Sequence, residues 1–73
     1  MEREKYQEAI KHFLLIAKNF PFHYETQMNL AASYLNLKLL NEAKSHYLQA
    51  LQINENDALS YFNLGVIYME QGQ

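Results

Sequence analysis

Three histidines are the side chains of this sequence best suited to hold a metal ion. His12 and His46 stand 34 residues apart, and His23 lies between them. A zinc site needs its ligand nitrogens about 2 Å from the metal. His12 and His46 fall in equivalent slots of a repeating sequence, and packed helices keep their axes about 8–10 Å apart. We therefore expect exposed histidines, with no metal site.

The serines do not predict a catalytic centre. Ser33, Ser45 and Ser60 all fall within stretches of helical pattern, and no glycine-rich turn presents one of them as a nucleophile. The glycines are Gly65 and Gly72, so the sequence contains no phosphate-binding loop. We expect no catalytic residue, no cofactor and no enzyme activity.

The charge balance argues against a nucleic-acid partner. The 73 residues include six Lys and Arg against eight Asp and Glu, for a formal net charge of −2. Binding to a phosphate backbone needs clustered basic residues. The six Tyr and four Phe are therefore not interpreted as a platform for base stacking, which accompanies a basic groove.

The apolar residues do not form a membrane span. The densest run, Phe13 to Ala17, is far shorter than the roughly 20 residues that a membrane helix needs. The first residues carry charges of both signs and lack the pattern of a secretory signal. We expect no membrane partner and a cytoplasmic location.

Helices must position whatever the chain binds with. The sequence has two Gly, one Pro and many strong helix formers. We expect an all-α fold of four helices, at about residues 2–19, 25–37, 41–53 and 58–71. Pro21 ends the first helix, because the residue before a proline is disfavoured in helix. Asn41 and Asp57 are the expected N-caps of the third and fourth helices.

The sequence repeats itself with a period of 34 residues. Aligning residues 1–39 with residues 35–73 places identical residues opposite each other. The identical pairs are Glu8/Glu42, Ala9/Ala43, His12/His46, Leu14/Leu48, Asn29/Asn63, Leu30/Leu64 and Tyr34/Tyr68. A period of this length is typical of a helix–turn–helix repeat.

The repeated residues resemble the tetratricopeptide-repeat (TPR) family. Its signature reads aromatic-x₂-Leu-Gly-x₂-Tyr, followed by Ala-x₃-Phe and then Pro. The first half is present at Tyr61, Leu64, Gly65 and Tyr68, and less completely at Leu30, Ala31 and Tyr34. The second half is present as Ala9-x₃-Phe13 with Pro21, and as Ala43-x₃-Tyr47. Three slots depart from the pattern, and they hold Gln27, Lys38 and Glu55 in place of a large apolar residue, a Gly and a Pro.

The resemblance implies antiparallel helix–turn–helix repeats stacked as a short right-handed α-solenoid. In this frame residues 1–73 are a single domain. Residues 1–23 supply the second helix of one repeat, 24–57 a complete repeat, and 58–73 the first helix of the next. Small residues such as Ala43 and Gly65 are expected where two helices approach most closely.

The family binds peptides in a concave groove lined by the first helix of each repeat. The resemblance implies that one repeat contributes Glu25, Met28, Asn29, Ala32, Leu35 and Asn36, and that the next contributes Leu59, Phe62, Asn63, Val66, Met69 and Glu70. One subset of the family grips a peptide carboxylate with Lys and Arg, but Glu25, Met28, Leu59 and Phe62 occupy those slots here. The alternative reading is that Met28 and Phe62 only pack between adjacent repeats.

The leading interpretation is a non-catalytic scaffold whose groove binds an apolar or amphipathic peptide or helix of another protein. The alternative is an assembly domain that forms homo-oligomers through its half-repeat ends. In that alternative one copy receives the first helix of another copy, in a head-to-tail contact. The residues expected to meet are Ala9, Phe13, Ile16, Leu64, Gly65 and Tyr68.

Overall fold

The chain folds into four α-helices in a computed structural model that describes residues 2–72. They are α1 (Glu2–Asn19), α2 (Tyr24–Asn36), α3 (Leu40–Ile53) and α4 (Ala58–Glu70). Each helix begins and ends within one residue of its expected position, and the all-α class is confirmed. The first and last residues of the predicted 1–73 domain lie outside the described residues.

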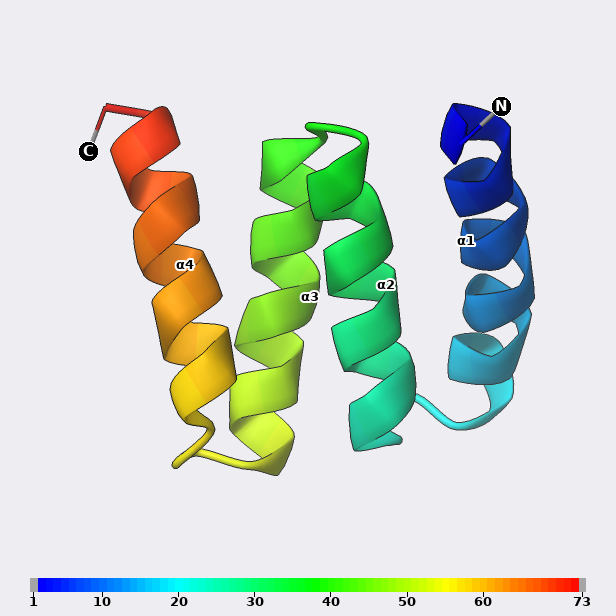
Figure 1. Ribbon diagram of the computed structural model, residues 1–73. Coiled ribbons are helices and arrows are strands. Elements are labelled where there is room, and N and C mark those ends of the chain that lie inside the picture. The colour runs from blue at the N-terminus through cyan, green and yellow to red at the C-terminus, as the bar shows by residue number, and fades with distance from the viewer. Residues whose placement is uncertain (1, 73) are drawn as a thin grey trace.

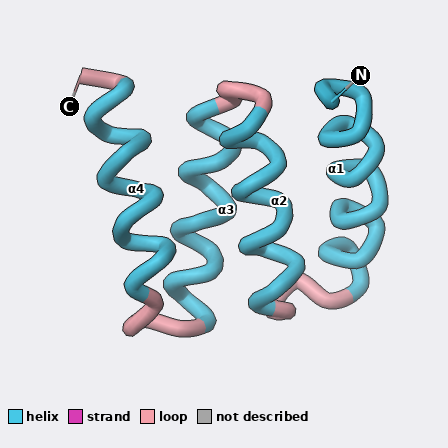
Figure 2. The backbone as a smooth tube through the Cα atoms, viewed as in Figure 1, coloured by secondary structure: helices cyan, strands magenta, loops and turns pink. Residues whose placement is uncertain are grey.

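The helices lie side by side and alternate in direction (Figure 1). Each packs against its neighbours in the sequence, so that α1 contacts α2, α2 contacts α3, and α3 contacts α4. The described residues measure 30 × 29 × 15 Å along the principal axes. The tube drawing shows three connecting loops at alternating ends of this layer (Figure 2). In consequence α1 and α4 form its two edges, and each has one side without a neighbouring helix.

Two apolar clusters hold the layer together. Buried residues of α2, α3 and α4 form the first cluster, which contains Ala31, Ala43, Tyr47, Leu64 and Ile67. The second joins α1 to α2 through Ile10, Leu30 and Leu37, with Phe13 and Tyr34 packed against them. The fully buried Ala31 and Ala43 occupy the close approach expected of small residues.

Gly65 does not have the expected role of a close helix contact within the described chain. It is exposed, and a Cβ atom placed on it would meet no heavy atom within 4 Å. Ala9 is only half-buried. Both residues lie on the edge helices α1 and α4, where the chain provides no second neighbour.

The turn between α2 and α3 is closed by backbone hydrogen bonds around Lys38. The Leu39 N–H donates to the Tyr34 carbonyl (3.0 Å) and the Lys38 N–H to the Leu35 carbonyl (2.9 Å). This pattern requires a left-handed residue between them, and Lys38 has φ 62°. Gly72, which follows Lys38 by 34 residues, has φ 76°. Lys38 therefore adopts the conformation of the family's Gly, at a cost of roughly 1–2 kcal/mol.

The caps of α3 and α4 differ from the expected ones. Helix α3 begins at Leu40 with Leu39 as its N-cap, so the expectation that Asn41 caps it is wrong. Asn41 Oδ1 instead accepts a hydrogen bond from Gln71 Nε2 (2.9 Å) and so ties the start of α3 to the end of α4. Asp57 does occupy the N-cap position of α4, but its side chain makes no capping bond to the backbone.

Candidate functional site

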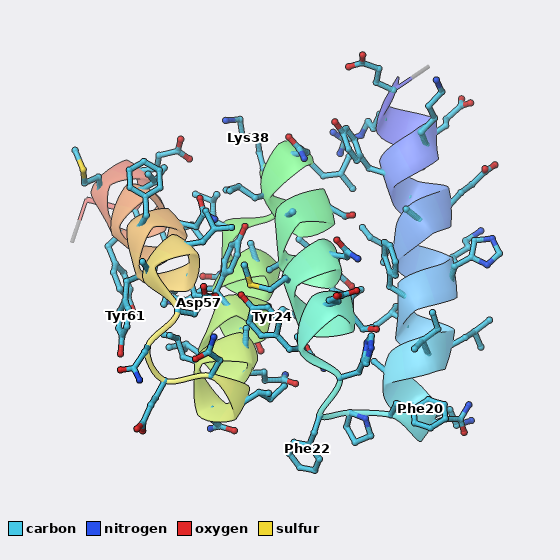
Figure 3. The ribbon with its side chains drawn as sticks, turned by 60° about the horizontal axis from the view of Figure 1, so that its bottom comes forward. Phe20, Phe22, Tyr24, Lys38, Asp57 and Tyr61 are labelled. Carbon is cyan, nitrogen blue, oxygen red and sulfur yellow. The ribbon has the colours of Figure 1, made fainter. Side chains whose placement is uncertain are left out.

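The residues expected to form a groove come together on one surface, which we call the α2–α4 face. It comprises Glu25, Met28, Asn29, Ala32, Leu35 and Asn36 from α2, with Leu59, Phe62, Asn63, Val66, Met69 and Glu70 from α4. Two side-chain hydrogen bonds join the helices, from Tyr24 Oη to Asp57 Oδ2 (2.6 Å) and from Ser60 Oγ to Met28 Sδ (3.1 Å). Figure 3 shows Tyr24 and Asp57 close together between α2 and α4.

Asp57 is the centre of this connection. Its carboxylate accepts hydrogen bonds from Ser60 Oγ and Tyr24 Oη. The bond from Ser60, followed by that from Tyr24, lowers the pKa of the Asp57 carboxyl below its ordinary value. The same hydrogen bond, together with burial, raises the pKa of Tyr24 to about 12. Tyr24 and Asp57 therefore remain a neutral hydroxyl and a carboxylate at neutral pH.

Large apolar side chains of α4 are exposed on the α2–α4 face. Leu59 is 56%, Phe62 68% and Met69 80% exposed. Val66 and Leu35 beside them are half-buried. Phe62 therefore does not pack between repeats, which was one reading of the sequence.

Met28 plays a different part. It is half-buried and packs against the cluster around Ala43 and Ile67. Its sulfur also accepts the hydrogen bond from Ser60. For Met28 the alternative of packing between neighbouring helices is therefore correct.

The polar residues of the α2–α4 face are amides and carboxylates. Glu25, Asn29, Asn36 and Glu70 are exposed, and Asn63 is half-buried. Lys38 Nζ lies 3.8 Å from Glu70 Oε1, with both side chains largely in water, so this ion pair contributes little to stability. The twelve residues include two acids and no base.

Sequence reasoning missed a buried polar network centred on Gln27. Gln27 Nε2 donates to the Pro21 carbonyl (3.0 Å), and Gln27 Oε1 lies 2.7 Å from His46 Nδ1. A carbonyl only accepts, so the amide orientation is fixed and Nδ1 of His46 must donate. The departure at Gln27 therefore does not loosen the repeat, because it links the α1–α2 loop to α3.

His46 is not the exposed residue that the sequence predicted. Its ring stacks on Tyr34 with centroids 5.5 Å apart, and burial lowers its pKa. The equivalent His12 on α1 is exposed. The signal that could have revealed this network was a polar residue, Gln27, in a slot where the family has a large apolar one. Among residues 2–72 no group of three His, Cys, Asp or Glu is placed to hold a metal ion.

The residues expected to associate head to tail lie in unlike environments. Ala9 and Phe13 are half-buried, and Phe13 packs on α2, whereas Ile16 is exposed. On α4, Gly65 and Tyr68 are exposed, but Leu64 is buried in the chain's own core. The association itself stays a prediction.

A hollow lies away from the α2–α4 face, at the loop between α1 and α2. Asn19, Phe20, Pro21, Phe22 and His23 line it. Phe20 and Phe22 are exposed, and Figure 3 shows both at the loop end of the molecule. Within the described part of the chain, no helix has the length and apolar character needed to cross a bilayer.

Comparison with known sequences gives one match. The family described as TPR repeat matches residues 31–72, which is more than half of the chain. No curated protein and no solved structure matches the chain.

Proposed function

Because the chain belongs to the tetratricopeptide-repeat family, whose repeats generally mediate protein–protein interaction, we propose that its α2–α4 face binds an apolar or amphipathic helix of another protein. The observation that carries this proposal is the exposure of Leu59, Phe62 and Met69 on one helix. Apolar side chains grouped on a surface mark a contact site. The proposed role is that of a scaffold and involves no catalysis.

The chemistry of the face indicates the kind of ligand. A helix that presents leucines at positions i, i+3, i+4 and i+7 offers one continuous apolar ridge. Phe62 and Met69 provide the complementary surface, and the flexible thioether of Met69 adapts to ridges of different shape. Asn29 and Asn63 supply neutral hydrogen-bonding groups at its middle. A partner that binds by a carboxylate clamp is not favoured, because the face carries no base.

Binding to this face should depend weakly on salt. The contacts are apolar, whereas screening acts on charges that lie in water. The probe is a synthetic amphipathic helical peptide with a leucine ridge and uncharged polar residues elsewhere. Its affinity at about 0.05 M and about 0.5 M salt should agree within about twofold.

Truncation of one side chain tests the location. Phe62→Ala should weaken binding of the peptide by about tenfold, equivalent to about 1.4 kcal/mol. Leu15→Ala is the matched control, because Leu15 is 64% exposed but lies on α1. Its affinity should equal that of the wild type. A steep loss of binding at high salt, or equal binding by Phe62→Ala, would contradict the proposal.

A further inference from the structure

Helix α4 is apolar on all sides. From Ala58 to Met69 it has no charged residue, and Glu70 follows at its last position. A helix of this composition is normally buried all round. In the structure it is covered by α3 and the start of α2 on one side alone, and Tyr61 lies on the side away from the other helices (Figure 3). By contrast, the free side of α1 carries charged residues such as Lys11 and Lys18.

Gly65 lies in the middle of this uncovered side. A glycine within a helix costs roughly 0.5–1 kcal/mol relative to alanine. No contact of the described chain requires it, since a Cβ atom there would meet nothing within 4 Å. Glycine permits the close approach of another backbone. Its position therefore indicates a partner helix that the described chain does not provide.

The large side chains around Gly65 are arranged symmetrically along the helix. Tyr61 and Phe62 precede it by four and three residues, and Tyr68 and Met69 follow it by three and four. Residues spaced by three and four lie on the same side of a helix. All four side chains are exposed, from 36% for Tyr68 to 80% for Met69. The surface therefore has the same order of large and small groups when read in either direction.

We propose that a second copy of this chain packs its α4 antiparallel against this one, with a two-fold axis at Gly65. In this pairing Phe62 of each copy lies against Tyr68 of the other, and Tyr61 lies against Met69. The Tyr61–Met69 contacts are favourable sulfur–aromatic pairs. Because both copies use the same surface, the assembly closes as a dimer. The head-to-tail arrangement, in contrast, would join α4 to α1.

The area available predicts a weak dimer. Large side chains of this kind bury 150–250 Å² each, and the exposed fractions of these four correspond to about 450 Å² per copy. The total of about 900 Å² is less than the 1,200–2,000 Å² of stable interfaces. The polar groups at its edge already have partners, because Tyr61 Oη donates to the Glu55 carbonyl and Lys44 Nζ lies 5.6 Å from the centre of the Tyr68 ring. Dimerisation therefore needs no buried charge.

The dimer surface overlaps the α2–α4 face at Phe62 and Met69. Leu59 and Val66 lie only on the α2–α4 face, whereas Tyr61 and Gly65 lie only on the dimer surface. A bound peptide and a second copy therefore compete for two side chains. Leu59→Ala should weaken peptide binding without changing dimerisation, which separates the two proposals.

Sedimentation of Gly65→Gln tests the axis. Glutamine is a good helix former, so the monomer should melt at the same temperature as the wild type or higher. Its side chain blocks the close approach, and the dissociation constant of the dimer should rise at least about tenfold. Ala32→Gln is the control, because it places the same side chain on an exposed site of α2 and should dimerise as the wild type does. A wild type that stays monomeric up to about 1 mM, or a Gly65→Gln variant that dimerises equally well, would overturn the proposal.

Disulfide trapping distinguishes the two-fold pairing from other contacts. The chain has no cysteine, so single substitutions report one position each. Gly65→Cys should form an intermolecular disulfide under oxidation, because two residues on the axis bring their Cα atoms within the roughly 4.4–6.8 Å that a disulfide spans. Ile16→Cys, at the exposed position of the head-to-tail contact on α1, should stay reduced. Equal or slower oxidation of Gly65→Cys than of Ile16→Cys would contradict the antiparallel pairing.

Discussion

Gln27 connects three parts of the chain through one amide. Its nitrogen binds the carbonyl of Pro21 and its oxygen binds His46, which in turn stacks on Tyr34. Buried polar groups are costly unless each finds a partner. Since Gln27 has a partner at each end, a polar residue replaces the family's large apolar one with its hydrogen-bonding groups satisfied.

This network makes Gln27→Leu destabilising, although leucine is closer to the family pattern. The substitution leaves the Pro21 carbonyl and the His46 ring nitrogen without their partner. We expect a loss of about 1–3 kcal/mol in the free energy of unfolding, measured by urea denaturation. The double variant Gln27→Leu/His46→Leu should recover part of this loss, because both polar partners are then removed. A Gln27→Leu variant more stable than the wild type would show that the network does not stabilise the fold.

Asp57 predicts an acid-sensitive connection between α2 and α4. Its hydrogen bonds hold the pKa below the ordinary value of 3.8. The folded state therefore binds the proton less well than the unfolded state. The stabilisation is present above pH 3.8 and is lost as the pH falls through that value towards the folded pKa.

Thermal melting between about pH 6 and pH 3 measures this effect. The melting temperature of the wild type should fall more across this range than that of Asp57→Asn, which has no carboxylate to protonate. Glu55→Gln is the control, because it removes an exposed carboxyl of the same turn, and its profile should follow the wild type. Parallel profiles for Asp57→Asn and the wild type would contradict the assigned role.

At the scale of the helices, the sequence determined the order and bounds of the elements. Pro21, the 34-residue period and the spacing of Leu30 and Tyr34 were enough to place four helices within one residue. The caps were harder to predict. Asn41 has a good N-cap side chain, but the closure of the preceding turn around Lys38 starts α3 at Leu40, one residue before Asn41. A side chain's capping preference is worth about 1 kcal/mol, so neighbouring turn geometry can decide the boundary.

Ala43→Leu tests how α3 packs against α2 and α4. Ala43 is fully buried in the cluster with Ala31 and Leu64, so three added carbons have no free space. We expect a loss of about 1–3 kcal/mol in the free energy of unfolding. Ala32→Leu adds the same atoms at an exposed position of α2 and should cost little. If both variants melted with the parent, the register of the helix pairs would be wrong.

At the scale of the whole molecule, equivalent residues of the repeat differ in burial. Ala43 is buried and Ala9 half-buried, and His46 is half-buried although His12 is exposed. The sequence predicts the slot of each residue on its helix, but burial depends on whether helices pack on both sides. The predicted face was therefore brought together on α2 and α4, whereas the roles of Met28, Gln27 and Gly65 required the structure. The unlike edges, with charges on the free side of α1 and none on α4 before Glu70, also follow from the spatial arrangement.

Mapping a bound peptide by NMR tests the central claim most directly. Backbone amide shifts of ¹⁵N-labelled Gly65→Gln protein would be recorded during titration with the leucine-ridge peptide, because this variant keeps dimer dissociation out of the signal. The account predicts that the largest shifts fall on Leu59, Phe62, Val66 and Leu35, with a peptide of the same composition but scrambled spacing producing none. Shifts concentrated at the hollow of Phe20–His23, or no shifts up to about 1 mM peptide, which corresponds to about −4.1 kcal/mol, would contradict it.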